Sequence, residues 1–192
     1  MTSLERTVVD VASAPHFARA VVMADAAFQT PVRHPLRRKH YPDGLQLPAV
    51  RAVLESLLPF PGSARAGRVL EFSNGCAGSP LESQFRVQCL ALGAPIPELQ
   101  VAFRDEDGFI GFADAYWREH DAAVEIDGRA KYGADRQFQQ DLAPEEILWR
   151  EKLRGDRLSR VVRRFDRLTR EDILDRRRLA GRLHRLGVMR RA

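Results

Sequence analysis

Residues 112–132 read FADAYWREHDAAVEIDGRAKY, and this stretch decides the fold of the C-terminal part of the chain. A polar segment, Arg118–Asp121, separates two apolar segments, which predicts a β-hairpin with its turn at those residues. With this turn, Tyr116 lies opposite Ala123, and Asp114 lies opposite Glu125. The register that buries the apolar residues therefore also brings two carboxylates together.

Alternation along the two strands divides the hairpin into two different faces. The core face is wholly apolar and consists of Ala113, Ala115, Trp117, Ala122, Val124 and Ile126. The opposite face consists of Phe112, Asp114, Tyr116, Ala123, Glu125 and Asp127. Phe112 and Tyr116 make this second face more apolar than a solvated face requires, so we expect another element to cover it. The helix predicted at 79–92 is the natural candidate.

Opposed carboxylates repel each other, because directly paired Cβ atoms lie about 4.5–5.5 Å apart. One carboxyl group can hold a proton through a raised pKa. A divalent cation, Mg²⁺ or Mn²⁺, can bind between the two groups. Arg118 or Arg129 can neutralise them, as on an ordinary charged strand face. The sequence leaves these three alternatives open.

The composition places the chain among cytoplasmic globular proteins. It has 192 residues, 44% of them hydrophobic, and no apolar run long enough to span a bilayer, so we expect no membrane association. The first ten residues, MTSLERTVVD, lack the pattern of a signal peptide. Cys76 and Cys89 have neither metal-binding spacing nor a secretory context, which predicts free buried thiols.

Basic residues are concentrated at the C-terminal end. Residues 145–192 contain 16 Lys and Arg against 8 Asp and Glu, within a chain of net charge +5. Such a segment is typical of a protein that contacts phosphate. The chain has only three lysines, however, so the charge also reflects a general preference for arginine. No glycine-rich phosphate loop, nucleophile elbow or Cys/His cluster indicates a metabolic enzyme.

The pattern of apolar residues predicts two domains, 1–75 and 76–192. The first is helical throughout, with apolar residues at three-to-four spacing in 4–12, 17–28, 47–58 and 63–72 and a basic, proline-containing loop at 30–44. Its helices could contact a protein partner. The second begins with a helix at 79–92, whose buried stripe is predicted to be Leu81, Phe85, Cys89 and Leu92.

The rest of the second domain predicts three strands, a helix, a strand and a final helix. The strands are 95–104, 109–117 and 122–128, with a turn at 105–108. A helix at about 135–158, interrupted near Pro144, precedes a short strand at 159–165. Thr169 is predicted to cap the last helix, which buries Ile173, Ala180 and Leu183 and ends at Gly187.

Two further residues are candidates for the site. Ser79, Pro80 and Glu82 form a capping-box pattern, so Glu82 is expected to close the start of the helix, although it could also point at the hairpin. Lys131 follows a short loop after Asp127. It could pair with Asp127, or hold a phosphate or a water nucleophile.

The order α-β-β-β-α-β-α around a mixed four-stranded sheet resembles the restriction-endonuclease-like core of the PD-(D/E)XK nuclease superfamily. The segments SPLES, ELQVAF, FADAYW, VEIDGRAKY, EKLRGDRL and VVRRF are most similar to its very-short-patch-repair endonuclease-like branch. This resemblance implies that Glu82, Asp114 and Glu125 surround a metal ion, with Asp127 and Lys131 beside it. Asp127 stands where the superfamily usually has lysine, and Lys131 where the branch often has histidine.

Residues 2–78 resemble the middle segment of actinobacterial type IV abortive-infection antitoxin-like regulators, without the winged helix that those proteins commonly carry. Two functions follow as hypotheses. The first is a Mg²⁺-dependent endonuclease that hydrolyses DNA, in which C-terminal arginines contact the DNA backbone. The second is a catalytically silent nuclease fold that serves an antitoxin or transcriptional regulator as a DNA- or partner-binding module.

Overall fold

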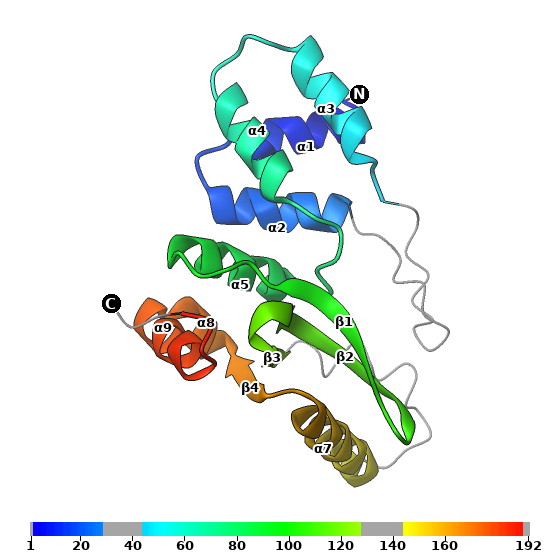
Figure 1. Ribbon diagram of the computed structural model, residues 1–192. Helices are drawn as coiled ribbons and strands as arrows, with labels where there is room; N and C mark the ends of the chain where they lie inside the picture. The colour runs from blue at the N-terminus through cyan, green and yellow to red at the C-terminus, as the bar shows by residue number, and fades with distance from the viewer. Residues whose placement is uncertain (1, 29–43, 128–143, 190–192) are drawn as a thin grey trace. The chain divides into compact units, whose positions relative to one another are not determined.

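The computed structural model describes residues 2–28, 44–127 and 144–189. The chain forms two compact units, Met1–Val87 and Gln88–Ala192. Figure 1 shows helices in the first unit and a sheet with helices in the second. The division falls inside one helix, α5 (Pro80–Ala91). The domain boundary at 75/76 stays a prediction.

The N-terminal unit confirms the four helices expected from apolar spacing. They are α1 (Leu4–Ala12), α2 (Phe17–Ala27), α3 (Leu47–Ser56) and α4 (Ser63–Phe72). Their buried faces form one core, which includes Val9, Val21, Val50 and Val69. The predicted basic loop falls almost entirely at 29–43, outside the described residues.

A buried ion pair ties α2 to the middle of α5 within this unit. Arg86 Nη1 donates to Asp25 Oδ2 at 3.2 Å, and both side chains are almost completely buried. Burial raises the pKa of Asp25, while hydrogen bonds from Ser83 and Asn74 and the charge of Arg86 oppose that rise. The Arg86 guanidinium also lies over the Phe72 ring. This polar core has no signal in the apolar pattern.

The sheet of the C-terminal unit is mixed and four-stranded. Its strands are β1 (Glu98–Asp105), β2 (Gly108–Trp117), β3 (Ala122–Asp127) and β4 (Arg164–Thr169). They lie in the order β1-β2-β3-β4, with antiparallel pairs at β1/β2 and β2/β3 and a parallel pair at β3/β4. The fold is therefore of the α/β class with a mixed sheet, as the sequence predicts at that coarse level.

The decisive hairpin has the predicted register. A 3₁₀ turn at Arg118–His120 and a left-handed Asp121 connect β2 to β3, and Tyr116 pairs with Ala123. Asp121 stabilises the connection, because its carboxylate accepts hydrogen bonds from the Tyr116 hydroxyl and the Arg163 backbone N–H.

The helix that covers the carboxylate face differs from our expectation. Leu158 and Val162 pack with Tyr116 and Ala123 in one buried cluster. Leu158 belongs to α7 (Pro144–Val161), which connects β3 to β4, and Val162 follows directly after it. In this cluster α7, rather than the expected helix at 79–92, covers the carboxylate face. A helical crossover between parallel strands naturally packs on the sheet it connects.

Two element boundaries in the C-terminal unit are also corrected. Residues 159–161 continue α7, and the last strand is 164–169 rather than 159–165, since Leu158 and Val162 at a spacing of four face the same core. The predicted final helix is two helices, α8 (Arg170–Leu174) and α9 (Arg176–Arg185). They divide at Asp175, whose carboxylate caps α9 by accepting from the N–H groups of Arg177 and Arg178.

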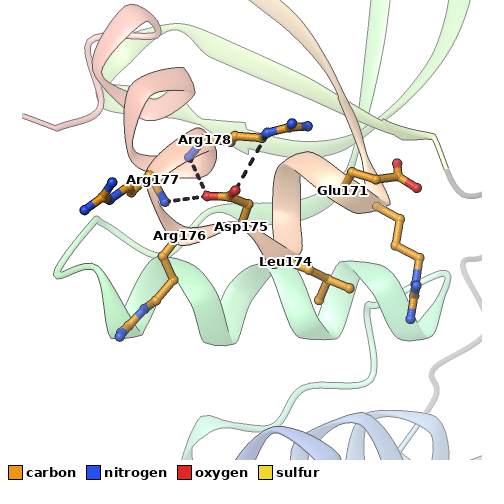
Figure 2. A pocket seen from close by; sticks show the side chains of 7 residues that line it. Glu171, Leu174, Asp175, Arg176, Arg177 and Arg178 are labelled. Carbon is orange, nitrogen blue, oxygen red and sulfur yellow. Dashed lines mark hydrogen bonds and ion pairs between the residues drawn. The ribbon is translucent and has the colours of Figure 1, made fainter.

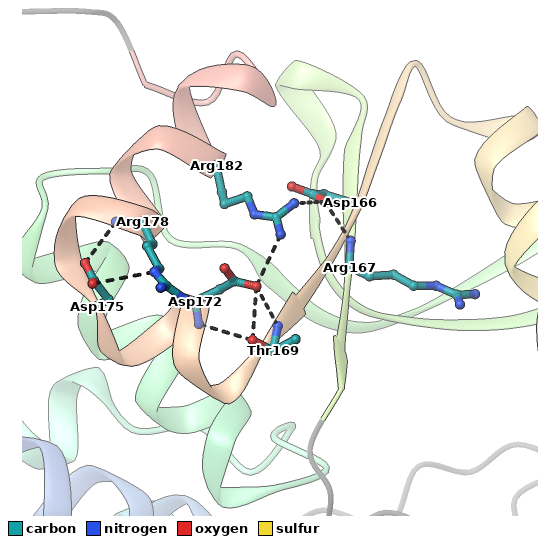
Figure 3. Close-up of polar contacts among 7 residues, drawn as sticks. All are labelled: Asp166, Arg167, Thr169, Asp172, Asp175, Arg178 and Arg182. Atoms are coloured by element: carbon teal, nitrogen blue, oxygen red, sulfur yellow. Dashed lines mark hydrogen bonds and ion pairs between the residues drawn. The ribbon is translucent and has the colours of Figure 1, made fainter.

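Other details of the C-terminal helices agree with prediction. Thr169 caps α8 in a capping box with Asp172, as Figure 3 shows. Ile173 and Leu183 are buried, although Ala180 is only partly so. Gly187 follows α9 in the left-handed conformation, which ends the helix.

Neither cysteine forms a disulfide, and Cys89 is buried as expected, but Cys76 is exposed, contrary to the prediction of two buried thiols. In the part of the chain that the structure describes, no helix has the length and apolar content needed to cross a bilayer.

Candidate functional site

The hairpin register places Asp114 and Glu125 on the same face of the sheet. Tyr116 and Ala123 are register partners. Asp114 lies two residues from Tyr116 and Glu125 two residues from Ala123, so all four side chains share one face. Both carboxylates are buried, with 7% and 8% of each residue exposed. They are close enough that the charge of Asp114 contributes to a raised pKa of Glu125.

Hydrogen bonds from Ile126 and Gln100, both among the described residues, hold the Asp114 carboxylate. Its Oδ2 accepts from the Ile126 backbone N–H at 2.7 Å, so a side-chain oxygen takes the place that a strand carbonyl would occupy. Its Oδ1 accepts from Gln100 Nε2 at 3.0 Å. Gln100 is itself buried and has a φ of 54°, a left-handed backbone that only a minority of residues other than glycine adopt. Such strained residues gather at functional sites.

Glu125 lies between two arginines from different elements. Arg154 Nη2 of α7 is 2.7 Å from Oε1, and Arg167 Nε of β4 is 3.0 Å from Oε2. Burial raises the pKa of Glu125, Arg154 and Arg167 oppose that rise, and the charges of Asp114 and Glu151 add to it. Oε1 is buried without an aligned hydrogen bond, so its contact with Arg154 is an ion pair alone.

Two glycines leave room for these arginines. A Cβ atom on Gly155 would lie 1.9 Å from Arg167 Nη2, and one on Gly111 would lie 3.1 Å from Arg154 Cδ. The Arg167 guanidinium therefore lies directly against the α7 backbone at Gly155, and the Arg154 side chain lies against the β2 backbone at Gly111. Arg118, which the sequence offered as a neutralising partner, instead pairs with Glu98 on the surface. Arg129 lies outside the described residues.

Glu82 belongs to the N-terminal unit, and its observed contacts are those of a helix cap. Its Oε2 accepts from the Gly78 N–H at 2.8 Å and its Oε1 from the Ser79 hydroxyl at 2.9 Å. Ser79 Oγ in turn accepts from the Glu82 N–H at 3.3 Å. The reciprocal bonding resembles a capping box, except that the carboxylate binds the N–H of Gly78 rather than that of Ser79.

Asp127 and Lys131 are the remaining two predicted site residues. Asp127 is exposed at the end of β3, where its register partner is Thr169. Lys131 lies outside the described residues. Within residues 2–28, 44–127 and 144–189, no three His, Cys, Asp or Glu side chains are grouped so that they could bind a metal ion.

Sequence reasoning did not identify Gln100, Arg154 or Arg167. Arg154 falls in EKLRGDRL, a segment of the family resemblance, and this was its only signal.

Comparison of the chain with protein-family models, curated proteins and solved structures gave no match. The function must therefore be argued from the geometry of the site.

Proposed function

We propose that the C-terminal unit is a nuclease-like domain of the PD-(D/E)XK type that hydrolyses DNA phosphodiester bonds with a divalent metal ion. The observation that carries this proposal is the pair of buried carboxylates, Asp114 and Glu125, on one face of the β2/β3 hairpin. The order of α5, three strands, α7 and β4 supports it, because the superfamily core has the same succession.

The donor set suits Mg²⁺ or Mn²⁺. Both ions prefer hard oxygen ligands, and Mg²⁺ typically uses one or two carboxylates. Oε1 of Glu125 has no aligned hydrogen bond but lies 2.7 Å from Arg154 Nη2, so a metal ion would take the place of that guanidinium group. Arg154 and Arg167 are partly exposed, so their side chains can move away from Glu125. When bound by Asp114 and Glu125, the ion would supply charge stabilisation at phosphate and a more acidic water.

The chain's own residues then have distinct roles. Gln100 and the Ile126 N–H hold Asp114 in one orientation, which keeps its position independent of substrate. Arg154 and Arg167, released from Glu125, would donate to phosphate oxygens with forked guanidinium groups. In this proposal Asp127 and Lys131 would stand beside the metal ion, as the resemblance implies.

A plasmid-nicking assay tests the proposal. The full chain with Mg²⁺ or Mn²⁺ should convert supercoiled plasmid to nicked or linear forms, and Glu125→Ala and Asp114→Asn should abolish this. Glu55→Gln, an exposed carboxylate of α3, is the matched control and should cleave as the wild type does. An intact plasmid with the wild type, or full cleavage by Asp114→Asn, would contradict the proposal.

The ion pairs of Glu125 favour a second candidate function. Arg154 and Arg167 already neutralise this carboxylate, so the cluster is electrostatically complete without an ion. Such a fold could serve an antitoxin-like regulator as a DNA- or partner-binding module. A wild type that leaves the plasmid intact but retards it in a gel would support this candidate. If the wild type neither cleaves the plasmid nor retards it at low salt, a protein partner of the N-terminal helices would be favoured.

A further inference from the structure

A second basic surface lies on α8 and α9, apart from the arginines that contact Glu125. An open groove of about 630 Å³ runs along the junction of the two helices, and a neighbouring groove of about 480 Å³ shares Arg177 and Arg178 with it. The arginines lining the two grooves are Arg170, Arg176, Arg177, Arg178, Arg182 and Arg185. In Figure 2 the side chains of Arg176, Arg177 and Arg178 spread outward from the start of α9.

The acidic residues of this surface are largely engaged within the fold. Asp175 Oδ1 accepts from the backbone N–H groups at the start of α9. Asp172 closes the α8 capping box and accepts from Arg182 at 3.3 Å, while Arg182 also donates to Asp166 at 2.8 Å, as Figure 3 shows. Asp166, Asp172 and Asp175 therefore fix the helices and one arginine, whereas Glu171, which also lines the first groove, is exposed and offsets part of the positive charge there.

Several guanidinium groups remain for an external partner. Among the residues that the structure describes, Arg170, Arg177 and Arg185 are exposed and have no acidic side-chain partner. The Arg178 side chain is 63% exposed and its Nε lies 3.7 Å from Asp175 Oδ2, which is longer than a hydrogen bond. Uncompensated, closely spaced positive charge attracts a polyanion. Arginine in particular binds phosphate through two parallel hydrogen bonds.

The apolar residues of α9 argue against a membrane surface as the partner. A helix that lies in a bilayer interface exposes an apolar face. Here Leu179, Leu183 and Leu186 are buried in the C-terminal unit, and only Leu174 of α8 contributes a large exposed apolar side chain to the groove. The exposed surface is thus guanidinium-rich without an insertion face, which suits a sugar–phosphate backbone.

We propose that the surface of Arg170, Arg177, Arg178 and Arg185 binds the phosphate backbone of DNA without sequence preference. The inference rests on the proposed function for the choice of DNA, but it does not depend on cleavage. It assigns to α8 and α9 the positioning of the duplex, and leaves Asp114 and Glu125 as the reacting centre.

The test is anisotropy of a fluorescent 20-base-pair duplex in EDTA, titrated with the full chain between 50 and 300 mM salt. The variant is the triple change Arg170→Gln, Arg177→Gln and Arg185→Gln. Each phosphate contact contributes about 0.9 to the slope of log affinity against log salt, so the slope should fall by about 2–3 and affinity at low salt by about tenfold or more. Matching melting temperatures establish that the variant is folded.

The matched control changes three exposed arginines of the N-terminal unit, Arg19→Gln, Arg51→Gln and Arg68→Gln, with the same loss of charge. It should bind as the wild type does. Equal loss in both variants, or no loss in the α8/α9 variant, would overturn the inference. Binding of wild type to anionic vesicles but not to duplex would also overturn it, in favour of a membrane.

The two proposals fail in different ways. If the wild type binds duplex through α8 and α9 in EDTA but leaves plasmid intact with Mg²⁺, the inference stands and the hydrolase function fails. If the α8/α9 variant binds and cleaves as the wild type does, the hydrolase function stands and the inference fails.

Discussion

Replacing Arg154 with Met removes one of the two cations that neutralise the buried Glu125 carboxylate. Methionine keeps an unbranched apolar stem against Gly111, so the change removes mainly the charge. Breaking a fully buried ion pair costs about 3–5 kcal/mol, and an exposed pair contributes about 1 kcal/mol or less. Arg154 is 31% exposed and Arg167 remains as a partner, so we expect a loss of about 1.5–3 kcal/mol at pH 7.

The loss should depend on pH with a definite sign. Burial raises the pKa of Glu125 above its unfolded value, so the cost of burying its charge is absent below the unfolded pKa and present in full above the folded pKa. Arg154 opposes that rise, and its removal therefore raises the folded pKa further. The destabilisation of Arg154→Met should therefore be larger at neutral pH than at acidic pH, and it should shrink as Glu125 becomes protonated.

Urea denaturation of a double-mutant cycle measures this effect. The cycle combines Arg154→Met with Glu125→Gln at pH 7 and again near pH 4, and its coupling energy isolates the pair. Arg150→Met, on the same helix and 61% exposed, is the matched control and should cost about 0.5 kcal/mol or less. A coupling within 0.5 kcal/mol of zero at pH 7, or one that is unchanged near pH 4, would refute the reasoning.

Three further changes test other parts of the structure by urea denaturation. Arg86→Met should destabilise the chain by about 3–5 kcal/mol, because it leaves Asp25 buried without its cation; a loss below about 1 kcal/mol would contradict the buried pair. Gly155→Ala should fail to give the gain of about 1 kcal/mol typical of a helix interior, since its Cβ displaces Arg167, and a full gain would show that Arg167 lies elsewhere. Ser79→Ala should cost about 1 kcal/mol through loss of the α5 cap, whereas no change would contradict the capping geometry.

The sequence was most informative where the apolar period was regular. The four N-terminal helices follow from three-to-four spacing between Pro- and Gly-containing breaks. The hairpin register follows because only one pairing places Ala115, Val124 and Ile126 together on an apolar face. The same parity argument places Asp114 and Glu125 on the other face.

Other features depend on contacts that no local pattern encodes. Val161 and Val162 are β-branched and favour a strand locally, yet α7 runs to Val161 because Leu158 and Val162 pack on the sheet. Alternation identifies the face that Glu125 occupies, but not which long side chain from α7 or β4 reaches it. The left-handed Gln100 has no sequence signal, since the position is not glycine.

Isothermal titration calorimetry with Mn²⁺ tests the central claim most directly, because it measures binding at the carboxylate pair without requiring DNA or turnover. The wild-type chain should bind the ion at one site, with Glu125→Ala and Asp114→Asn each abolishing the heat and Glu55→Gln preserving it. Wild-type protein that binds no Mn²⁺, or binding that survives in Glu125→Ala, would contradict the assignment of Asp114 and Glu125 as a metal centre.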